Sequence, residues 1–219
     1  MNFVFFVIFS LAVFLASLVC YNKYRATTLY ALAIGGVVNA NFFHAGNYPI
    51  NCFNLPFGID SIIYTLFVFC VVVMFIKDGK RPAYLLAFSS IIAIMFSAVM
   101  QLVSDLLSFG SSIDVWTTFF TFCISSVASV ISIVVMLEIL DKIKNKTNSY
   151  VLLIVGIVIV AVLDTLIYYP LATLINGVPN NMLILLLTSI LGKTLALGCG
   201  LIALFFMNKI ENKKPKQNA

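Results

Sequence analysis

An acidic and a basic residue stand deep inside two consecutive apolar stretches of this sequence. Asp164 lies in VLDTLIYYPLATL (162–174), and Lys193 lies in SILGKTLAL (189–197). A charge at the centre of a bilayer costs about 2.5–3.5 kcal/mol on insertion scales, so each charge needs a partner or a function. The short segment 176–181 joins the two stretches and predicts antiparallel neighbours. Both charges lie roughly 12–15 residues from it, hence at similar depth, and we expect them to face each other.

Two roles for this pair are open. An internal ion pair can fix the rotation of two helices and serve structure alone. However, replacing a buried pair with apolar residues is often neutral or stabilising, so the pair is weak support for a purely structural purpose. Transporters bind polar substrates near the middle of the membrane. We therefore favour Asp164 and Lys193 as substrate-binding residues, and we expect no catalytic residue.

Other polar side chains gather toward the same predicted side of the membrane. Gln101 and Asp105 are four residues apart and share one helix face, and Asn39 and Asn41 end an earlier apolar run. Tyr168 follows Asp164 by one helical turn, where an aromatic ring could stack on a flat ligand. We include all five as candidate binding residues. Their alternative roles are to mark the water boundary or, for Tyr168, to join an interfacial aromatic belt.

Two further residues lead to local expectations. Glu138 precedes Lys142 by four residues, a spacing that predicts an ion pair along one helix. Pro170 lies inside the apolar run of Asp164 and can break or kink that helix, because proline lacks the backbone N–H.

The composition indicates a membrane protein. Of 219 residues, 62% are hydrophobic and 10% are charged, whereas soluble domains are about 45–50% apolar and about 25% charged. We predict an all-α fold, a polytopic membrane helix bundle of six to seven transmembrane helices. It forms a single transmembrane domain over 1–208, followed by a short basic cytoplasmic tail over 209–219. The predicted spans are 2–21, 27–43, 57–76, 83–104, 115–140, 149–172 and 181–208.

The positive charges predict the orientation of these spans. Twelve of the 13 Lys and Arg residues follow the first, third, fifth and seventh spans, and the loops 44–56, 105–114 and 173–180 contain none. By the positive-inside rule the amino terminus lies outside and the carboxyl terminus lies in the cytoplasm of a multi-pass protein of the cell (inner) membrane. The net charge of +5 is then a topology signal beside anionic lipid, and we expect the bilayer, not nucleic acid, as a partner.

Several classes of chemistry have no motif here. The chain contains no Walker A loop, no GxSxG, no HExxH and no Cys/His spacing typical of a metal site. We therefore expect neither an enzyme nor a bound metal or cofactor. The oligomeric state, the exact substrate and the energy source stay open at this point.

The last two apolar runs resemble a known family. AVLDTLIYYPLATL (161–174) and LLTSILGKTLALGCGLIALFF (186–206) are similar to the final two helices of the queuosine-precursor transporters, also called vitamin-uptake-transporter-like proteins. NANFF (39–43) and LPFGIDSIIYTLFVF (55–69) are more loosely similar to its early helices. The chain departs from the family pattern in two other helices, where apolar residues replace the family's polar ones, so a different substrate is an alternative.

The resemblance implies a small helix bundle that imports a 7-deazaguanine base. It implies binding roles for Asp164 and Lys193 and, by a looser match, for Asn39 and Asn41. We accordingly predict a transporter of a small polar heterocycle, with a small-molecule substrate that is purine-like or vitamin-like. The alternative is a membrane protein that binds or senses a ligand, or an accessory subunit, without transport.

Overall fold

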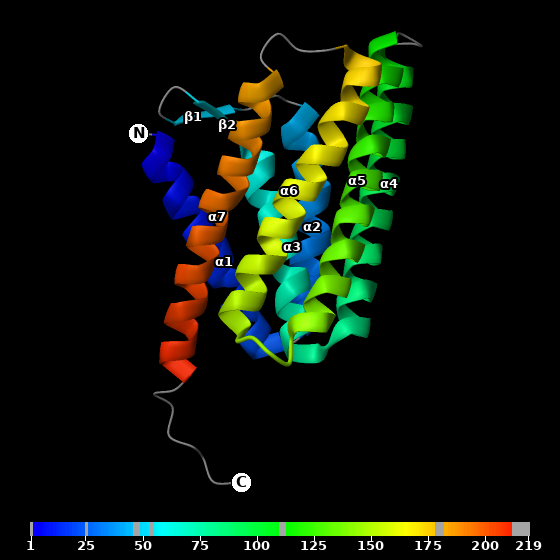
Figure 1. The fold of residues 1–219 in the computed structure, drawn as a ribbon. Coiled ribbons are helices and arrows are strands. Elements are labelled where there is room, and N and C mark those ends of the chain that lie inside the picture. The colour runs from blue at the N-terminus through cyan, green and yellow to red at the C-terminus, as the bar shows by residue number, and fades with distance from the viewer. Residues whose placement is uncertain are drawn as a thin grey trace.

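The protein is described here by a computed structural model over residues 2–24, 26–45, 49–52, 55–109, 113–177 and 182–211. These ranges contain seven helices and one short hairpin (Figure 1). The elements are α1 (Asn2–Tyr24), α2 (Ala26–Ala45), β1 (Pro49–Cys52), β2 (Leu55–Gly58), α3 (Ile59–Asp78), α4 (Lys80–Phe109), α5 (Ile113–Ile143), α6 (Ser149–Asn176) and α7 (Met182–Glu211).

The helical fold class is confirmed, and each predicted span corresponds to one helix. Among the described residues, four helices are long and apolar enough to cross a membrane, over Lys80–Ser108, Asp114–Ile143, Ser149–Asn176 and Met182–Phe205. The chain is thus a multi-pass membrane protein by the length and composition of its helices. The structure also changes two boundaries, because α7 continues to Glu211 instead of ending at 208, and 212–219 of the predicted tail lie outside the described residues.

The predicted loop 44–56 contains regular structure. Strands β1 and β2 pair antiparallel, with Pro49 opposite Gly58 and Cys52 opposite Leu55. The hairpin contacts α1 and α7 and lies at the end of the bundle where α1 begins (Figure 1). Strands this short are not distinguishable from a loop by their sequence pattern, since four residues give too few alternations.

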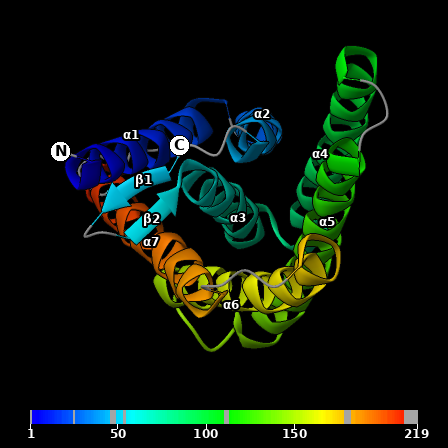
Figure 2. The same ribbon diagram turned by 90° about the horizontal axis from the view of Figure 1, so that it is seen from above.

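Helix α3 forms the centre of the bundle. The other six helices pack in the order α1, α2, α4, α5, α6, α7, and α7 returns to α1, so that they surround α3 (Figure 2). Every side chain from Ile62 to Phe75 is buried except Tyr64, which is partly buried. A helix that is apolar all round fits such a central position. Tyr64 therefore brings a hydroxyl group into the interior of the protein.

Specific residues end and begin these helices. Gly79 alone separates α3 from α4, with φ of 97°, and its N–H donates to the carbonyls of Met74 and Phe75 at 3.1 Å. Gly177 ends α6 with φ of 76°. Glycine suits both positions because it adopts positive φ without steric cost. At the start of α6, the Asn148 side chain accepts from the Val151 N–H at 2.9 Å, which satisfies one free helix-end donor.

The basic segments of the described chain gather at one end of the bundle. Figure 1 shows the α3–α4 turn and the α5–α6 connection at the lower end, where α7 also finishes. Lys77, Lys80 and Arg81 belong to the first of these segments, and Lys142, Lys144 and Lys146 to the second. The alternation of helix directions that the charges predicted is therefore present, with α1 beginning and α7 ending at opposite ends.

The predicted pair of Glu138 with Lys142 is wrong. Lys80 at the start of α4 lies 2.9 Å from the Glu138 carboxylate and 3.2 Å from that of Asp141. The Tyr84 hydroxyl also donates to Glu138, at 2.8 Å. An ion pair along a solvated helix stabilises little, and packing of α4 on α5 gives Glu138 two partners across the interface instead.

The predicted interruption at Pro170 is also not present, because α6 continues through Pro170 to Asn176. The hydroxyl of Thr173 donates to the Pro170 carbonyl at 2.7 Å in the turn that follows. Membrane helices tolerate proline where side chains or neighbouring helices satisfy the backbone groups.

Candidate functional site

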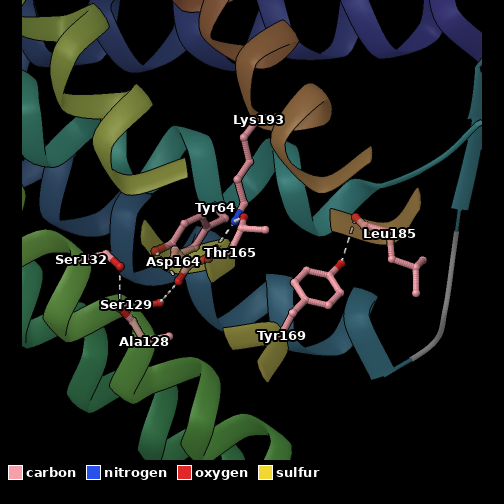
Figure 3. Close-up of polar contacts among 9 residues, drawn as sticks. All are labelled: Tyr64, Ala128, Ser129, Ser132, Asp164, Thr165, Tyr169, Leu185 and Lys193. Atoms are coloured by element: carbon pink, nitrogen blue, oxygen red, sulfur yellow. Dashed lines mark hydrogen bonds and ion pairs between the residues drawn. The ribbon is translucent and has the colours of Figure 1, made fainter. Parts of the chain in front are cut away.

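Asp164 and Lys193 form an ion pair in the interior of the bundle, as their spacing predicted. Asp164 Oδ2 and Lys193 Nζ are 2.7 Å apart, and the two residues are 8% and 7% exposed (Figure 3). Asp164 lies twelve residues before the end of α6, and Lys193 lies eleven residues after the start of α7. At 1.5 Å per residue both are about 17 Å from those helix ends, near the middle of a bilayer-sized bundle.

The second oxygen of Asp164 binds two hydroxyl groups. Tyr64 from α3 donates to Oδ1 at 3.1 Å, and Ser129 from α5 donates to the same oxygen at 3.2 Å. Together with Lys193 from α7, these contacts join the carboxylate on α6 to three other helices (Figure 3). The carboxylate is thus the point at which four helices meet.

Lys193 has further partners on its other sides. Its ammonium group donates to the Thr165 hydroxyl at 3.3 Å and lies 5.0 Å from the centre of the Tyr64 ring. An ammonium group carries three N–H donors, and a tyrosine face attracts a cation within about 6 Å. Both charges of the pair are consequently satisfied by protein groups. We define Asp164, Lys193, Tyr64, Ser129 and Thr165 as the central polar cluster.

Ser129 belongs to a row of serines on α5. Ser126, Ser129 and Ser132 recur every third residue and are 3%, 2% and 0% exposed, respectively. Ser126 and Ser132 donate to carbonyls four residues earlier in their own helix. This is the usual way in which a hydroxyl is satisfied inside a helix. Ser129 instead donates to Asp164 on another helix, which marks it as the member of the row that contributes to the cluster.

Sequence analysis did not identify Tyr64, Ser129 or Thr165. Thr165 had a signal, because it directly follows Asp164, and the three-residue serine spacing was a signal for Ser129. Tyr64 had none beyond a polar hydroxyl in an apolar run. Its role depends on the central position of α3, and that position follows from the packing of seven helices.

The other predicted binding residues occupy separate positions. Tyr168 lies one turn beyond Asp164 on α6, and its ring meets that of Tyr169 edge to face at 5.3 Å. Gln101 and Asp105 lie in the last third of α4 and make no hydrogen bond or ion pair with the central polar cluster in the described part of the chain. Asn39 and Asn41 lie within α2, and their side chains are outside the described residues. Ligand contact by these five residues stays a prediction.

The cluster has the chemistry of a hydrogen-bonding site for a polar molecule. It offers one carboxylate acceptor, one ammonium donor and three hydroxyl groups that can act as either. In the described ranges, no group of three or more His, Cys, Asp or Glu side chains could hold a metal ion. Comparison of the chain with models of known protein families, with curated proteins and with solved structures finds no match to it.

Proposed function

We propose that this chain is a membrane transporter that moves a small polar heterocycle across the bilayer. The observation that carries the proposal is the buried Asp164–Lys193 pair at a point where α3, α5, α6 and α7 meet. A ligand that enters there must break contacts that join four helices. Binding and helix rearrangement are therefore linked, which is the requirement for alternating access.

The donors and acceptors of the cluster suit a ligand with both kinds of group on one edge. The Asp164 carboxylate accepts from ligand N–H groups, and the Lys193 ammonium donates to a ligand carbonyl. The lactam edge of a 7-deazaguanine base has this pattern. The resemblance of residues 161–174 and 186–206 to queuosine-precursor transporters supports the same substrate, which we propose as the ligand.

The apolar composition near the basic end of the bundle is relevant to the substrate. Val72, Ile133 and Met136, where that family has polar residues, are 0%, 1% and 0% exposed and belong to the apolar core. The central polar cluster therefore lacks a second polar layer at these positions. A substrate smaller than the family's own is the alternative that this packing favours.

We further propose that all seven helices cross the cell membrane, with the basic end of the bundle in the cytoplasm. Lys77, Lys80 and Arg81 lie at the same end as Lys142, Lys144 and Lys146 (Figure 1). The positive-inside rule places such an end on the cytoplasmic side. A cysteine at Asn145 would then be labelled only from the cytoplasm, and one at Ser108, near the other end of α4, only from outside. Labelling of both from one side would overturn this orientation.

The decisive experiment supplies a 7-deazaguanine precursor at low external concentration to bacteria that can neither make nor import it. Queuosine in transfer RNA is then measured in cells that carry the wild-type chain or Asp164→Asn. We expect queuosine with the wild type and none with Asp164→Asn at equal membrane levels. A matched control is Thr194→Val, because Thr194 donates only to carbonyls of its own helix in the described contacts.

The negative outcomes are also informative. If purified protein binds the base and cells accumulate no queuosine, the chain is a binding or sensing protein. If it does not bind the base, the substrate assignment is wrong, and thermal stabilisation by other bases and vitamins identifies the ligand class. If Asp164→Asn supports normal uptake, the central polar cluster is structural.

A further inference from the structure

We propose that Asp164 is a proton-loading site, at which Lys193 and a proton hold the carboxylate in alternation. This inference deepens the proposed function and rests on it for the identity of the ligand that displaces Lys193. It adds the coupling ion, which is the proton. Neither the sequence pattern nor the comparison with known proteins assigns one.

The first step of the argument is that the carboxylate has no vacant side for a ligand. Oδ2 accepts from Lys193 at 2.7 Å, and Oδ1 accepts from Tyr64 at 3.1 Å and from Ser129 at 3.2 Å. The groups that face Asp164 are thus Tyr64 from α3, Ser129 from α5 and Lys193 from α7. A ligand reaches the carboxylate only by displacing one of them.

The second step concerns which group leaves. Tyr64 and Ser129 are held on α3 and α5, and both approach Oδ1. Lys193 approaches Oδ2 on a flexible four-carbon stem and has two other partners, the Thr165 hydroxyl at 3.3 Å and the face of the Tyr64 ring at 5.0 Å. It can release Asp164 and keep those partners while it donates to a ligand carbonyl. Lys193 is therefore the group that a ligand replaces most readily.

The third step follows from charge. Lys193 is the cation in contact with Asp164, and Asp164 is 8% exposed. A buried carboxylate that loses its cation becomes neutral by taking up a proton, because an unpaired charge in an apolar interior is too costly. The proton comes from the aqueous phase that is open to the site and adds to Oδ2. It leaves to the other side when Lys193 returns to the ionised carboxylate.

Binding and proton uptake can be measured together on the full-length protein in lipid nanodiscs. Calorimetry with 7-deazaguanine as the probe, in two buffers with different heats of ionisation, gives the protons taken up per ligand bound. We expect about one proton per ligand for the wild type and none for Asp164→Asn. Binding by the wild type without proton uptake would overturn the proposal and leave the proposed transport function intact.

A second measurement does not depend on the ligand. Infrared spectra at neutral pH report whether a carboxyl group is protonated, and Asp164→Asn identifies the band of Asp164. We expect that band in Lys193→Gln and its absence in the wild type. If 7-deazaguanine does not bind, the substrate is another molecule and this comparison decides: an ionised Asp164 in Lys193→Gln overturns the proposal. If Lys193→Gln does not fold, Lys193→Met, which fills the same volume, serves in its place.

Discussion

The ammonium group of Lys193 lies 5.0 Å from the centre of the Tyr64 ring, across the interface between the last helix and the central one. The same tyrosine donates its hydroxyl to Asp164 at 3.1 Å. Tyr64 therefore touches both members of the ion pair, with its ring on the cation and its hydroxyl on the anion. It connects residues that are 100 positions apart in the chain.

Tyr64→Phe separates these two contacts, because phenylalanine keeps the ring beside Lys193 and removes the donor to Asp164. A hydrogen bond to a charged group stabilises a protein by about 1.5–3 kcal/mol, and we expect a loss of that order. Thermal unfolding in lipid nanodiscs measures it. Tyr64→Leu, which removes the ring as well, should lose more stability, and equal losses would show that the ring does not contribute.

Substitution of the ion pair distinguishes a binding site from a structural pair. Lys193→Met leaves Asp164 without a cation and should destabilise the protein by about 3–5 kcal/mol. The double variant Asp164→Leu/Lys193→Met removes both charges and should recover most of that stability. Under the proposed function all three variants lose uptake. Uptake by the double variant, at normal membrane levels, would mean that the pair serves structure alone.

Gly156 allows α6 to approach α3 and α5 closely. A Cβ added there would lie 2.9 Å from Val72 and 3.2 Å from Leu140. Gly156→Ala should therefore destabilise the protein by about 1–3 kcal/mol, the usual cost of overpacking a core. Gly198→Ala is the matched control, since no atom lies within 4 Å of its added Cβ. Equal unfolding temperatures for the two variants would contradict this packing.

The charged contacts at the basic end predict a difference between two lysines. Lys80 bonds Glu138 and Asp141, whereas Lys142 is exposed and has no ion pair within the described ranges. Lys80→Ala should lower the unfolding temperature at low salt more than Lys142→Ala does. The difference should shrink at high salt, because ions screen exposed charges. A larger effect of Lys142→Ala would support the ion pair within α5 instead.

Much of the fold was predictable because bilayer thickness fixes helix length and charge fixes loop position. The antiparallel pair of Asp164 and Lys193 followed from a short connection and equal depth. Helix rotation was not predictable, since a helix that is apolar on every side carries no pattern that tells which face meets which neighbour. For that reason Tyr64 was missed, and Glu138 was assigned to Lys142 instead of Lys80.

The serines show the same limit at closer range. A three-residue spacing placed Ser126, Ser129 and Ser132 on one face of α5, but all three can bond their own backbone. Only the position of Asp164 opposite Ser129 distinguishes it from the other two. The sequence supplied the row, and the packing of α5 on α6 selected its functional member.

The ring of helices around α3 has a consequence for biogenesis. The ribosome delivers α3 to the membrane before four of the six helices that surround it, so this helix first meets lipid on faces that are later buried. Asp164 likewise enters before Lys193, its counter-charge. The last helix to leave the ribosome is the one that closes the ring onto α1 and neutralises that aspartate. We therefore expect nascent chains that stop before α7 to be recognised by membrane quality control, and completion of α7 to act as the checkpoint for assembly.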